Sequence, residues 1–195
     1  SGGRSLTWKE LVDASDALAL WLETELAANP GPVAVHGHKE PEMLIAFLAA
    51  VKCGRAYVPM DVNIPAQRIA KIVEASEAAV VLTPERVATL LPGLPDHGGR
   101  KPLRRVEGDD PFYTLFTSGS TGEPKGVVIT LRNLEAFTAW MFGEQGFQEQ
   151  GEVFLNQAPF SFDLSVMDVY CSLLSGGTLF CVTKEELSNL KELYR

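Results

Sequence analysis

The sequence predicts an α/β fold, with a layered α/β/α arrangement in which helices cover both faces of a mainly parallel sheet. Strand-like and helix-like segments alternate along almost the whole chain, and this alternation is typical of parallel strands joined by crossover helices. Hydrophobic residues make up 46% and charged residues 22% of the 195 residues. This composition is that of a globular protein long enough to bury a substantial core.

Capping residues and prolines predict three helices in the first half of the chain. Thr7 and Glu10 have the spacing of a capping box, in which each side chain accepts from the backbone amide of the other residue. Pro41 fits the first turn of a second helix and Gly54 its end. Pro65 opens a third helix. The strands expected in this half are residues 32–35, 56–59 and 79–82.

A segment rich in Gly and Pro separates this half from the next. Residues 92–111 predict a flexible surface connection, within which residues 103–106 could form a short strand. The alternation of strands and helices then resumes. The expected helices are residues 131–142, residues 163–174 and a last helix that begins at residue 183, and the expected strands are residues 112–116, 127–130, 153–156 and 178–182.

Charge, hydropathy and cysteine content exclude several functional classes. The formal net charge is −8, whereas a nucleic-acid surface needs a basic face. The longest apolar run, Leu44 to Val51, is far shorter than the ~20 residues of a membrane-spanning helix, so we expect no membrane insertion. Cys53, Cys171 and Cys181 form no CxxC pair, so we expect no metal site and no disulfide, but buried thiols in a cytoplasmic protein.

A run rich in glycine and hydroxyl side chains, Thr117 to Gly126, is the strongest functional signal in the chain. It reads T-S-G-S-T-G-E-P-K-G, and glycine amides, hydroxyl donors and a lysine suit the oxygens of a polyphosphate. A Walker A loop is excluded, because Pro124 precedes Lys125 where that loop requires Gly. The alternative is a hairpin loop without a ligand. The candidate ATP phosphate-binding residues are Thr117, Ser118, Gly119, Ser120, Thr121, Gly122 and Lys125.

This run resembles the phosphate loop of adenylate-forming enzymes, the family of acyl-CoA synthetases, luciferases and peptide-synthetase adenylation domains. Three other segments also resemble this family, namely Ser5–Leu11, Val51–Asp61 and Phe162–Ser165. The first two have structural explanations, because Glu10 caps a helix, Gly54 ends one and Pro59 suits a turn. The resemblance covers the whole chain, which is similar to the N-terminal part of the large subdomain of such enzymes.

The resemblance implies ATP and Mg²⁺ as cofactors and roles for two side chains. Lys125 would be the catalytic residue that offsets charge on the leaving pyrophosphate, while the loop hydroxyls bind the phosphates. Asp163 of the F-D-x-S segment would bind the ammonium group of an amino-acid substrate. The alternative is that Asp163 only caps the helix that it begins, and both roles could hold together.

Three longer stretches, residues 36–43, 61–72 and 154–168, are similar to D-alanine–carrier protein ligases, one branch of this family. The similarity implies that ATP activates D-alanine and that the acyl group passes to the phosphopantetheine thiol of a carrier protein, for D-alanylation of teichoic acid in the cell wall. The alternatives are a peptide-synthetase adenylation domain for another amino acid and a non-catalytic remnant or interaction module.

Several segments typical of the family do not occur up to Arg195, namely Y-G-P-T-E, T-G-D and the C-terminal lid. The resemblance therefore implies that residues 1–195 are the N-terminal portion of an adenylation domain. We expect little activity from this portion by itself, because adenylation needs all of its positioning groups. An incomplete α/β sheet leaves an apolar face and an unpaired edge, so we also expect self-association.

Overall fold

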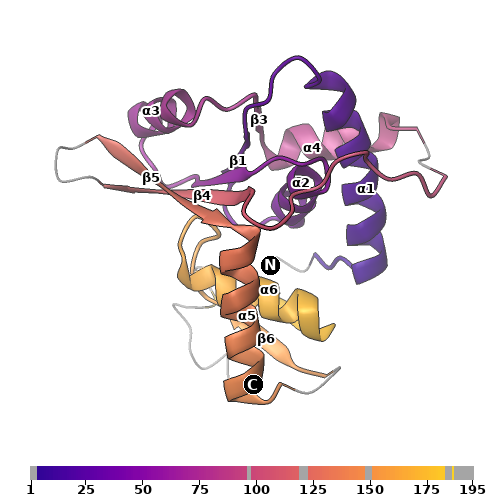
Figure 1. Cartoon of the computed structure of the whole chain (residues 1–195), viewed down its shortest axis with the longest axis vertical. Coiled ribbons are helices and arrows are strands. Elements are labelled where there is room, and N and C mark those ends of the chain that lie inside the picture. Colours follow the sequence, from indigo (N-terminus) through magenta and orange to yellow (C-terminus); the bar gives the residue numbers. More distant parts are fainter. Residues whose placement is uncertain (1–3, 96–97, 119–122, 148–150, 183–185, 187–195) are drawn as a thin grey trace.

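A computed structural model describes residues 4–95, 98–118, 123–147, 151–182 and 186 of the chain (Figure 1). Strands and helices alternate along it, as the sequence predicts. The helices are α1 (Trp8–Glu25), α2 (Pro41–Lys52), α3 (Ala66–Ser76), α4 (Pro84–Leu90), α5 (Leu131–Gln145) and α6 (Leu164–Ser175), with a short 3-10 helix, η1 (Leu91–Gly93). The strands are β1 (Val33–Gly37), β2 (Tyr57–Asp61), β3 (Val80–Leu82), β4 (Pro111–Ser118), β5 (Pro124–Thr130), β6 (Val153–Asn156) and β7 (Thr178–Cys181).

Five strands form the main sheet, in the order β3-β1-β2-β4-β5. β1 pairs in parallel with β2 and β3, and β2 pairs in parallel with β4, whereas β5 runs antiparallel to β4. β6 and β7 form a separate parallel pair, and β6 lies below the main sheet in Figure 1. The prediction of an α/β fold with a mainly parallel sheet is confirmed, but the division into two sheets is a feature that the sequence does not predict.

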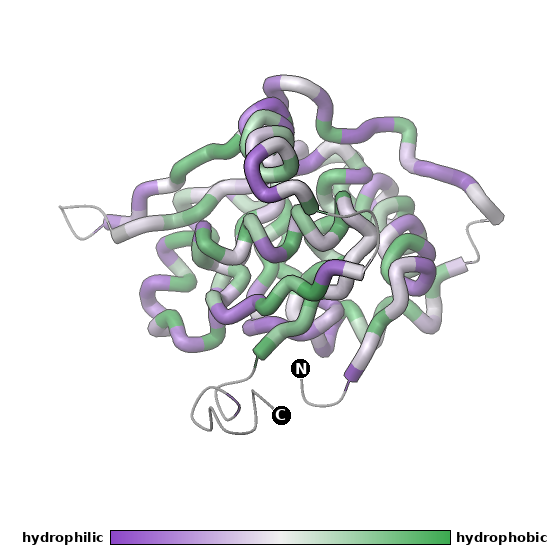
Figure 2. The backbone as a smooth tube through the Cα atoms, turned by 90° about the horizontal axis from the view of Figure 1, so that it is seen from below, coloured by the Kyte–Doolittle hydropathy of each residue, from purple (hydrophilic) through white to green (hydrophobic). Residues whose placement is uncertain are grey.

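Alternate residues of the central strands face opposite layers of helices. Val33 and Val35 of β1 belong to the larger core, together with residues of α1, α2 and α4, whereas Ala34 belongs to a smaller core with Ile72 of α3. Helices therefore cover both faces of the main sheet, as the sequence predicts. Figure 2 shows hydrophobic segments running through the middle of the molecule, with hydrophilic stretches along the outer loops.

The ends of the first two helices follow the predicted capping residues. The Thr7 hydroxyl accepts from the Glu10 amide, and the Glu10 carboxylate accepts from the Thr7 amide. Pro41 occupies the first turn of α2. Gly54 follows the end of α2 with φ 77°, a left-handed conformation that favours glycine. These local expectations are confirmed.

Two expectations about strands are wrong. Residues 103–106 form no strand, because the Val106 amide bonds the Val51 carbonyl at 2.9 Å and the segment runs as a loop. The predicted strand at residues 56–59 is present as β2, but it extends to Asp61, so Pro59 lies inside it, opposite Val35 of β1, and not at a turn.

Helix α4 is not among the predicted elements, and its signal is short. Thr83 caps it by accepting from the Arg86 amide, and Pro84 occupies its first turn. The predicted last helix, from residue 183, falls outside the described residues except for Glu186.

One buried hydrogen bond joins the main sheet to α6. The hydroxyl oxygens of Tyr57 and Tyr170 lie 2.5 Å apart, and burial raises the pKa of both side chains. We expect Tyr57→Phe to lower the free energy of unfolding by about 1–3 kcal/mol, because it leaves the Tyr170 hydroxyl buried without this partner. The double variant Tyr57→Phe/Tyr170→Phe removes both hydroxyls and should recover most of the loss. Urea unfolding followed by circular dichroism checks this, and a single variant as stable as the parent contradicts it.

Candidate active site

The described residues of the phosphate-loop sequence belong to a β-hairpin of β4 and β5 that projects from the main sheet (Figure 1). β4 and β5 pair so that Thr117 lies opposite Lys125, and the Thr117 hydroxyl donates to the Lys125 carbonyl at 3.4 Å. The hairpin thus brings two of the predicted phosphate-binding residues together. Ser118 ends β4. The other four predicted residues, Gly119, Ser120, Thr121 and Gly122, lie outside the described residues.

Packing across the hairpin accounts for the last glycine of the motif. A Cβ atom added at Gly126 would lie 3.0 Å from the Thr114 methyl carbon and 3.2 Å from the Phe116 ring. Both distances are shorter than ordinary van der Waals contacts. Gly126 therefore lets the two strands pair closely at the base of the loop.

The Lys125 side chain is exposed, and none of the described carboxylates forms an ion pair with it. The neighbouring Glu123 instead pairs with Lys71 of α3 at 2.7 Å. The charge of Lys125 is therefore available to a ligand of the loop.

Asp163, the predicted ammonium-binding residue, immediately precedes α6 and is exposed to solvent. Its backbone has φ −59° and ψ −30°, and its side chain makes no capping hydrogen bond. The alternative in which this carboxylate caps the helix is therefore wrong, because a cap residue needs an extended backbone to reach the helix amides. The carboxylate remains available to a substrate.

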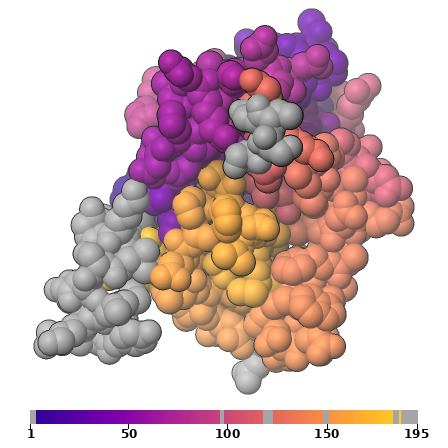
Figure 3. All heavy atoms as spheres, turned by 90° about the vertical axis from the view of Figure 1, so that its left-hand side faces the viewer, coloured from indigo at the N-terminus to yellow at the C-terminus, as the bar shows by residue number. Residues whose placement is uncertain are grey.

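Asp163 lies on the same side of the molecule as the hairpin. Tyr113 and Leu115 of β4 line a small pocket together with Ser165 and Val166 of α6, so the start of α6, which Asp163 immediately precedes, lies beside the strand that leads into the phosphate loop. Burial and, to a smaller extent, the charge of Asp163 raise the pKa of Tyr113 to about 12. Figure 3 looks onto the end from which the hairpin projects, where α3 (purple), the hairpin (salmon) and the segment around α6 (yellow-orange) face the same way.

Ser165, the serine of F-D-x-S, has a structural role. Its buried hydroxyl donates to the Phe162 carbonyl at 2.7 Å and to the Phe160 carbonyl at 3.5 Å. The Phe160 ring packs edge-on against Phe47 of α2, with 6.0 Å between ring centroids. Together these contacts fix the segment that ends in Asp163.

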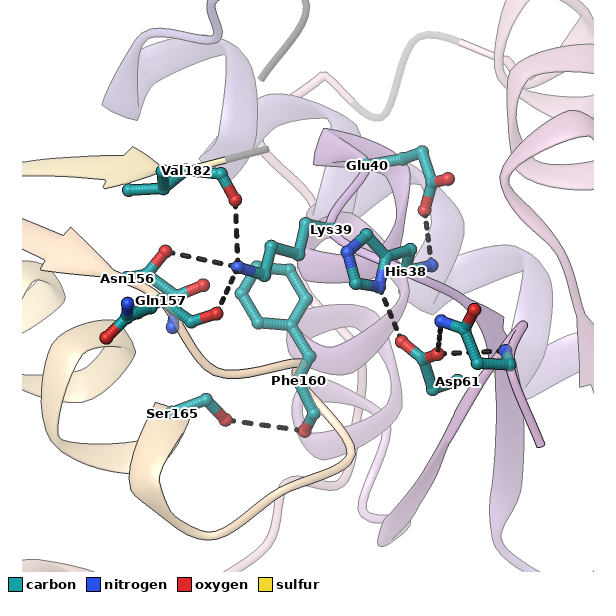
Figure 4. A network of polar contacts seen from close by, with 10 residues as sticks. His38, Lys39, Glu40, Asp61, Asn156, Gln157, Phe160, Ser165 and Val182 are labelled. Carbon is teal, nitrogen blue, oxygen red and sulfur yellow. Dashed lines mark hydrogen bonds and ion pairs between the residues drawn. The ribbon is translucent and has the colours of Figure 1, made fainter. Parts of the chain in front are cut away.

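A polar network next to this segment is not predicted by the sequence (Figure 4). His38 Nδ1 lies 2.5 Å from Asp61 Oδ2, and Asp61 also accepts from the Asn63 amide at 2.9 Å. Burial opposes ionisation of Asp61, but the bonds from His38 and Asn63 prevail and lower its pKa. The adjacent Lys39 donates to main-chain oxygens near the ends of β6 and β7. The sequence signal that could have revealed this network is the position of His38, Lys39 and Asp61. They lie at or just after the carboxyl ends of parallel strands, where ligands of α/β proteins bind.

The described residues contain neither a cluster of metal-binding side chains nor a membrane-spanning helix. Among them, no group of three or more His, Cys, Asp and Glu side chains could hold a metal ion. No described helix is long and apolar enough to cross a membrane. The three cysteines are free and buried, and burial raises the pKa of Cys53 to about 11, which makes its thiol unreactive.

Comparison with protein families gives a match over the whole chain. The model of the AMP-binding enzyme family matches residues 1–195. The chain belongs to this family. It is 46% identical over 202 residues to a D-alanine–D-alanyl carrier protein ligase of Bacillus anthracis, and 46% identical over 203 residues to one of Bacillus cereus. Each match covers 97% of this chain and 40% of the relative, so the chain spans well under half the length of these relatives.

Solved structures agree with the family. The N-terminal subdomain of Klebsiella oxytoca NpsA, in complex with 3-hydroxyanthranilyl-AMSN, has a TM-score of 0.76 and 28% identity, over 92% of this chain and 47% of that chain. The nonribosomal peptide synthetase FmoA3 has a TM-score of 0.75 and 30% identity, over 92% of this chain and 20% of that chain. The fold is that of the N-terminal subdomain of adenylate-forming enzymes, as the sequence predicts.

Proposed function

We propose that this chain is part of an enzyme that uses ATP to activate D-alanine and then transfers the alanyl group to a carrier protein. The identity of 46% to D-alanine–D-alanyl carrier protein ligases, over 97% of the chain, carries this proposal. The free carboxylate of Asp163 supports an amino-acid substrate, because an exposed carboxylate without a capping role suits an ammonium group.

In the proposed reaction, a carboxylate oxygen of D-alanine attacks the α-phosphorus of ATP, and the bond to the bridging oxygen breaks. Pyrophosphate leaves, and its charge is offset by Lys125. The hydroxyls of Thr117, Ser118, Ser120 and Thr121 bind the phosphates, while Gly119 and Gly122 let the backbone approach them. Asp163 holds the ammonium group of D-alanine and of the alanyl-adenylate.

Mg²⁺ would reach this site with the phosphates of ATP, whose charge it partly neutralises. The described residues contain no group of three or more side chains that could hold the ion, so no step is assigned to it.

The second half-reaction transfers the alanyl group to the phosphopantetheine thiol of the carrier, and AMP leaves. The proposed role is D-alanylation of teichoic acid, with the ATP-dependent step in the cytoplasm. We also propose that this 195-residue portion associates with itself, because the apolar side chains of Val153, Leu155 and Phe180 are exposed on β6 and β7, where Leu155 lies opposite Phe180.

ATP–pyrophosphate exchange tests the activation step. We expect exchange in the longest natural form of the protein that depends on D-alanine, with much less exchange on L-alanine and none without an amino acid. Residues 1–195 alone should show little exchange, because positioning groups supplied by the rest of an adenylation domain contribute orders of magnitude to the rate. Absence of exchange with any amino acid in the longest form overturns the proposed function.

A second candidate is an adenylation domain of a peptide synthetase that activates another amino acid. The TM-score of 0.75 and identity of 30% to the peptide synthetase FmoA3 favour it. A panel of amino acids in the same exchange assay separates the two candidates. A strong preference for an amino acid other than D-alanine would support the second.

A further inference from the structure

Lys39 lies in the turn between β1 and α2, and only 4% of it is exposed. Its ammonium group donates to three main-chain oxygens, those of Gln157 at 2.7 Å, Val182 at 3.0 Å and Asn156 at 3.2 Å (Figure 4). Asn156 ends β6, Gln157 follows it, and Val182 follows β7. The three protons of the ammonium group thus bind one end of the β6–β7 pair.

A buried ammonium group is a costly way to join two elements. Burial lowers the pKa of Lys39, although the charges of Asp168 and Asp61 oppose this shift. Hydrophobic side chains of similar volume join buried elements without this desolvation cost. The bonds of Lys39 therefore favour a role in positioning over a role in stability.

Two of the three oxygens that Lys39 binds, those of Asn156 and Gln157, lie where the segment that carries Asp163 begins. This segment comprises residues 157–163. Its far end is fixed by the Ser165 hydroxyl, which donates to the Phe162 carbonyl. Its middle is held by the Phe160 ring against α2. Lys39 fixes its start to the turn after β1, and so helps to set where Asp163 lies relative to the main sheet.

The two candidate substrate sites belong to different parts of the fold. The phosphate loop follows β4 of the main sheet, whereas Asp163 begins α6, which packs against β6 and β7. At the amino end of β7, the indole nitrogen of Trp8 donates to the Gly177 carbonyl at 3.0 Å. Lys39 makes the corresponding link at the carboxyl end, which is the end next to the candidate site.

We propose that Lys39 is a positioning residue that sets the distance between the ammonium site at Asp163 and the phosphate loop. The proposal rests on the proposed function. One carbon separates the ammonium group of D-alanine from its attacking carboxylate, so both groups are placed together only if the two sites are correctly spaced. β-Alanine carries the same groups separated by two carbons, and it therefore reports on this spacing.

The variant Lys39→Met removes the donors and keeps a side chain of similar length. In ATP–pyrophosphate exchange by the longest natural form, we expect the ratio of kcat/KM for D-alanine to kcat/KM for β-alanine to fall about tenfold. This ratio does not depend on the fraction of folded enzyme, so a purely structural role would leave it unchanged. A ratio equal to that of the parent overturns the proposal.

Lys52→Met is the matched control. Lys52 is also a lysine of the α2 region that bonds across elements, but it pairs with Asp16 of α1 at 2.7 Å, away from the segment of Asp163. We expect the control to keep the parental ratio. A ratio that falls equally in both variants would overturn the proposal, because it would trace the effect to α2 in general.

Hydrogen exchange in the 195-residue chain tests the tether without requiring activity. The Phe162 amide donates to the Pro159 carbonyl within the segment, and the Ser165 amide donates back to the Phe162 carbonyl, each at 3.0 Å. We expect them to exchange about tenfold faster in Lys39→Met than in the parent, while the amides of β1 are unchanged. Equal protection in both proteins overturns the proposal. If hydrogen exchange is faster in Lys39→Met but the parent shows no pyrophosphate exchange, the structural tether is confirmed and only the proposed function is overturned.

Discussion

Lys125→Ala is expected to slow D-alanine-dependent ATP–pyrophosphate exchange by about 10²–10³-fold, the usual cost of removing one group that stabilises transition-state charge. Lys125 is exposed at the base of the phosphate loop, and no described carboxylate pairs with it. Its charge is therefore free to act on the pyrophosphate as the α-phosphorus bond breaks. The loss should appear in kcat, whereas KM for D-alanine should change little, because the role proposed for Lys125 is on the pyrophosphate and not on the amino acid.

Two variants control this prediction. Lys125→Arg keeps the positive charge and should retain more activity than the alanine variant. Lys101→Ala removes an exposed lysine from the loop that precedes β4, at the opposite end of that strand from the phosphate loop, and should be fully active. Because Lys125 is exposed, its replacement should not alter urea unfolding. Exchange at the parental rate in Lys125→Ala would show that other groups offset the charge of pyrophosphate.

Much of the fold could be predicted from the sequence because its signals are local. The capping box of Thr7 and Glu10, Pro41 at the first turn of α2 and Gly54 after its end each act within a few residues. Helix α4 could not be predicted from periodicity, because its seven residues span only two turns. The separate β6–β7 pair depends on long-range packing, which no local pattern encodes.

The same limit applies to the candidate site. Lys125 and Asp163 belong to continuous segments that resemble a family, so the sequence alone singles them out. The bonds of Lys39 span 117, 118 and 143 residues of sequence, and a lysine that precedes a helix is ordinarily a solvated surface residue. Only the arrangement of the two sheets brings this side chain to the segment of Asp163.

The motifs combine binding groups with groups that hold them in place. In the phosphate loop, Gly126 allows close pairing of β4 and β5, whereas Lys125 keeps its charge unpaired among the described residues. In F-D-x-S, Ser165 bonds the carbonyls of its own loop, whereas Asp163 stays exposed. A family motif therefore marks a site, but the structure is needed to assign which of its residues can meet the substrate.

Asp163→Asn is expected to raise KM for D-alanine by roughly 10–100-fold, because a hydrogen bond to a charged group contributes about 1.5–3 kcal/mol. The asparagine has nearly the same shape but no charge to attract the ammonium group. KM for ATP should remain close to that of the parent, because the proposed binding site of the phosphates is the hairpin and not Asp163. Steady-state ATP–pyrophosphate exchange measures both constants.

The discrimination between D-alanine and D-lactate gives a second readout, because D-lactate carries a hydroxyl in place of the ammonium group. The parent should prefer D-alanine strongly, and the variant should lose most of this preference. A stability measurement separates a binding role of Asp163 from a helix-capping role. The Asp163 side chain makes no capping bond, so Asp163→Ala should unfold at the same urea concentration as the parent. Loss of a true cap would instead lower the free energy of unfolding by about 1 kcal/mol. A variant that kept the parental KM and the parental discrimination would place the ammonium group elsewhere and remove the main structural support for an amino-acid substrate.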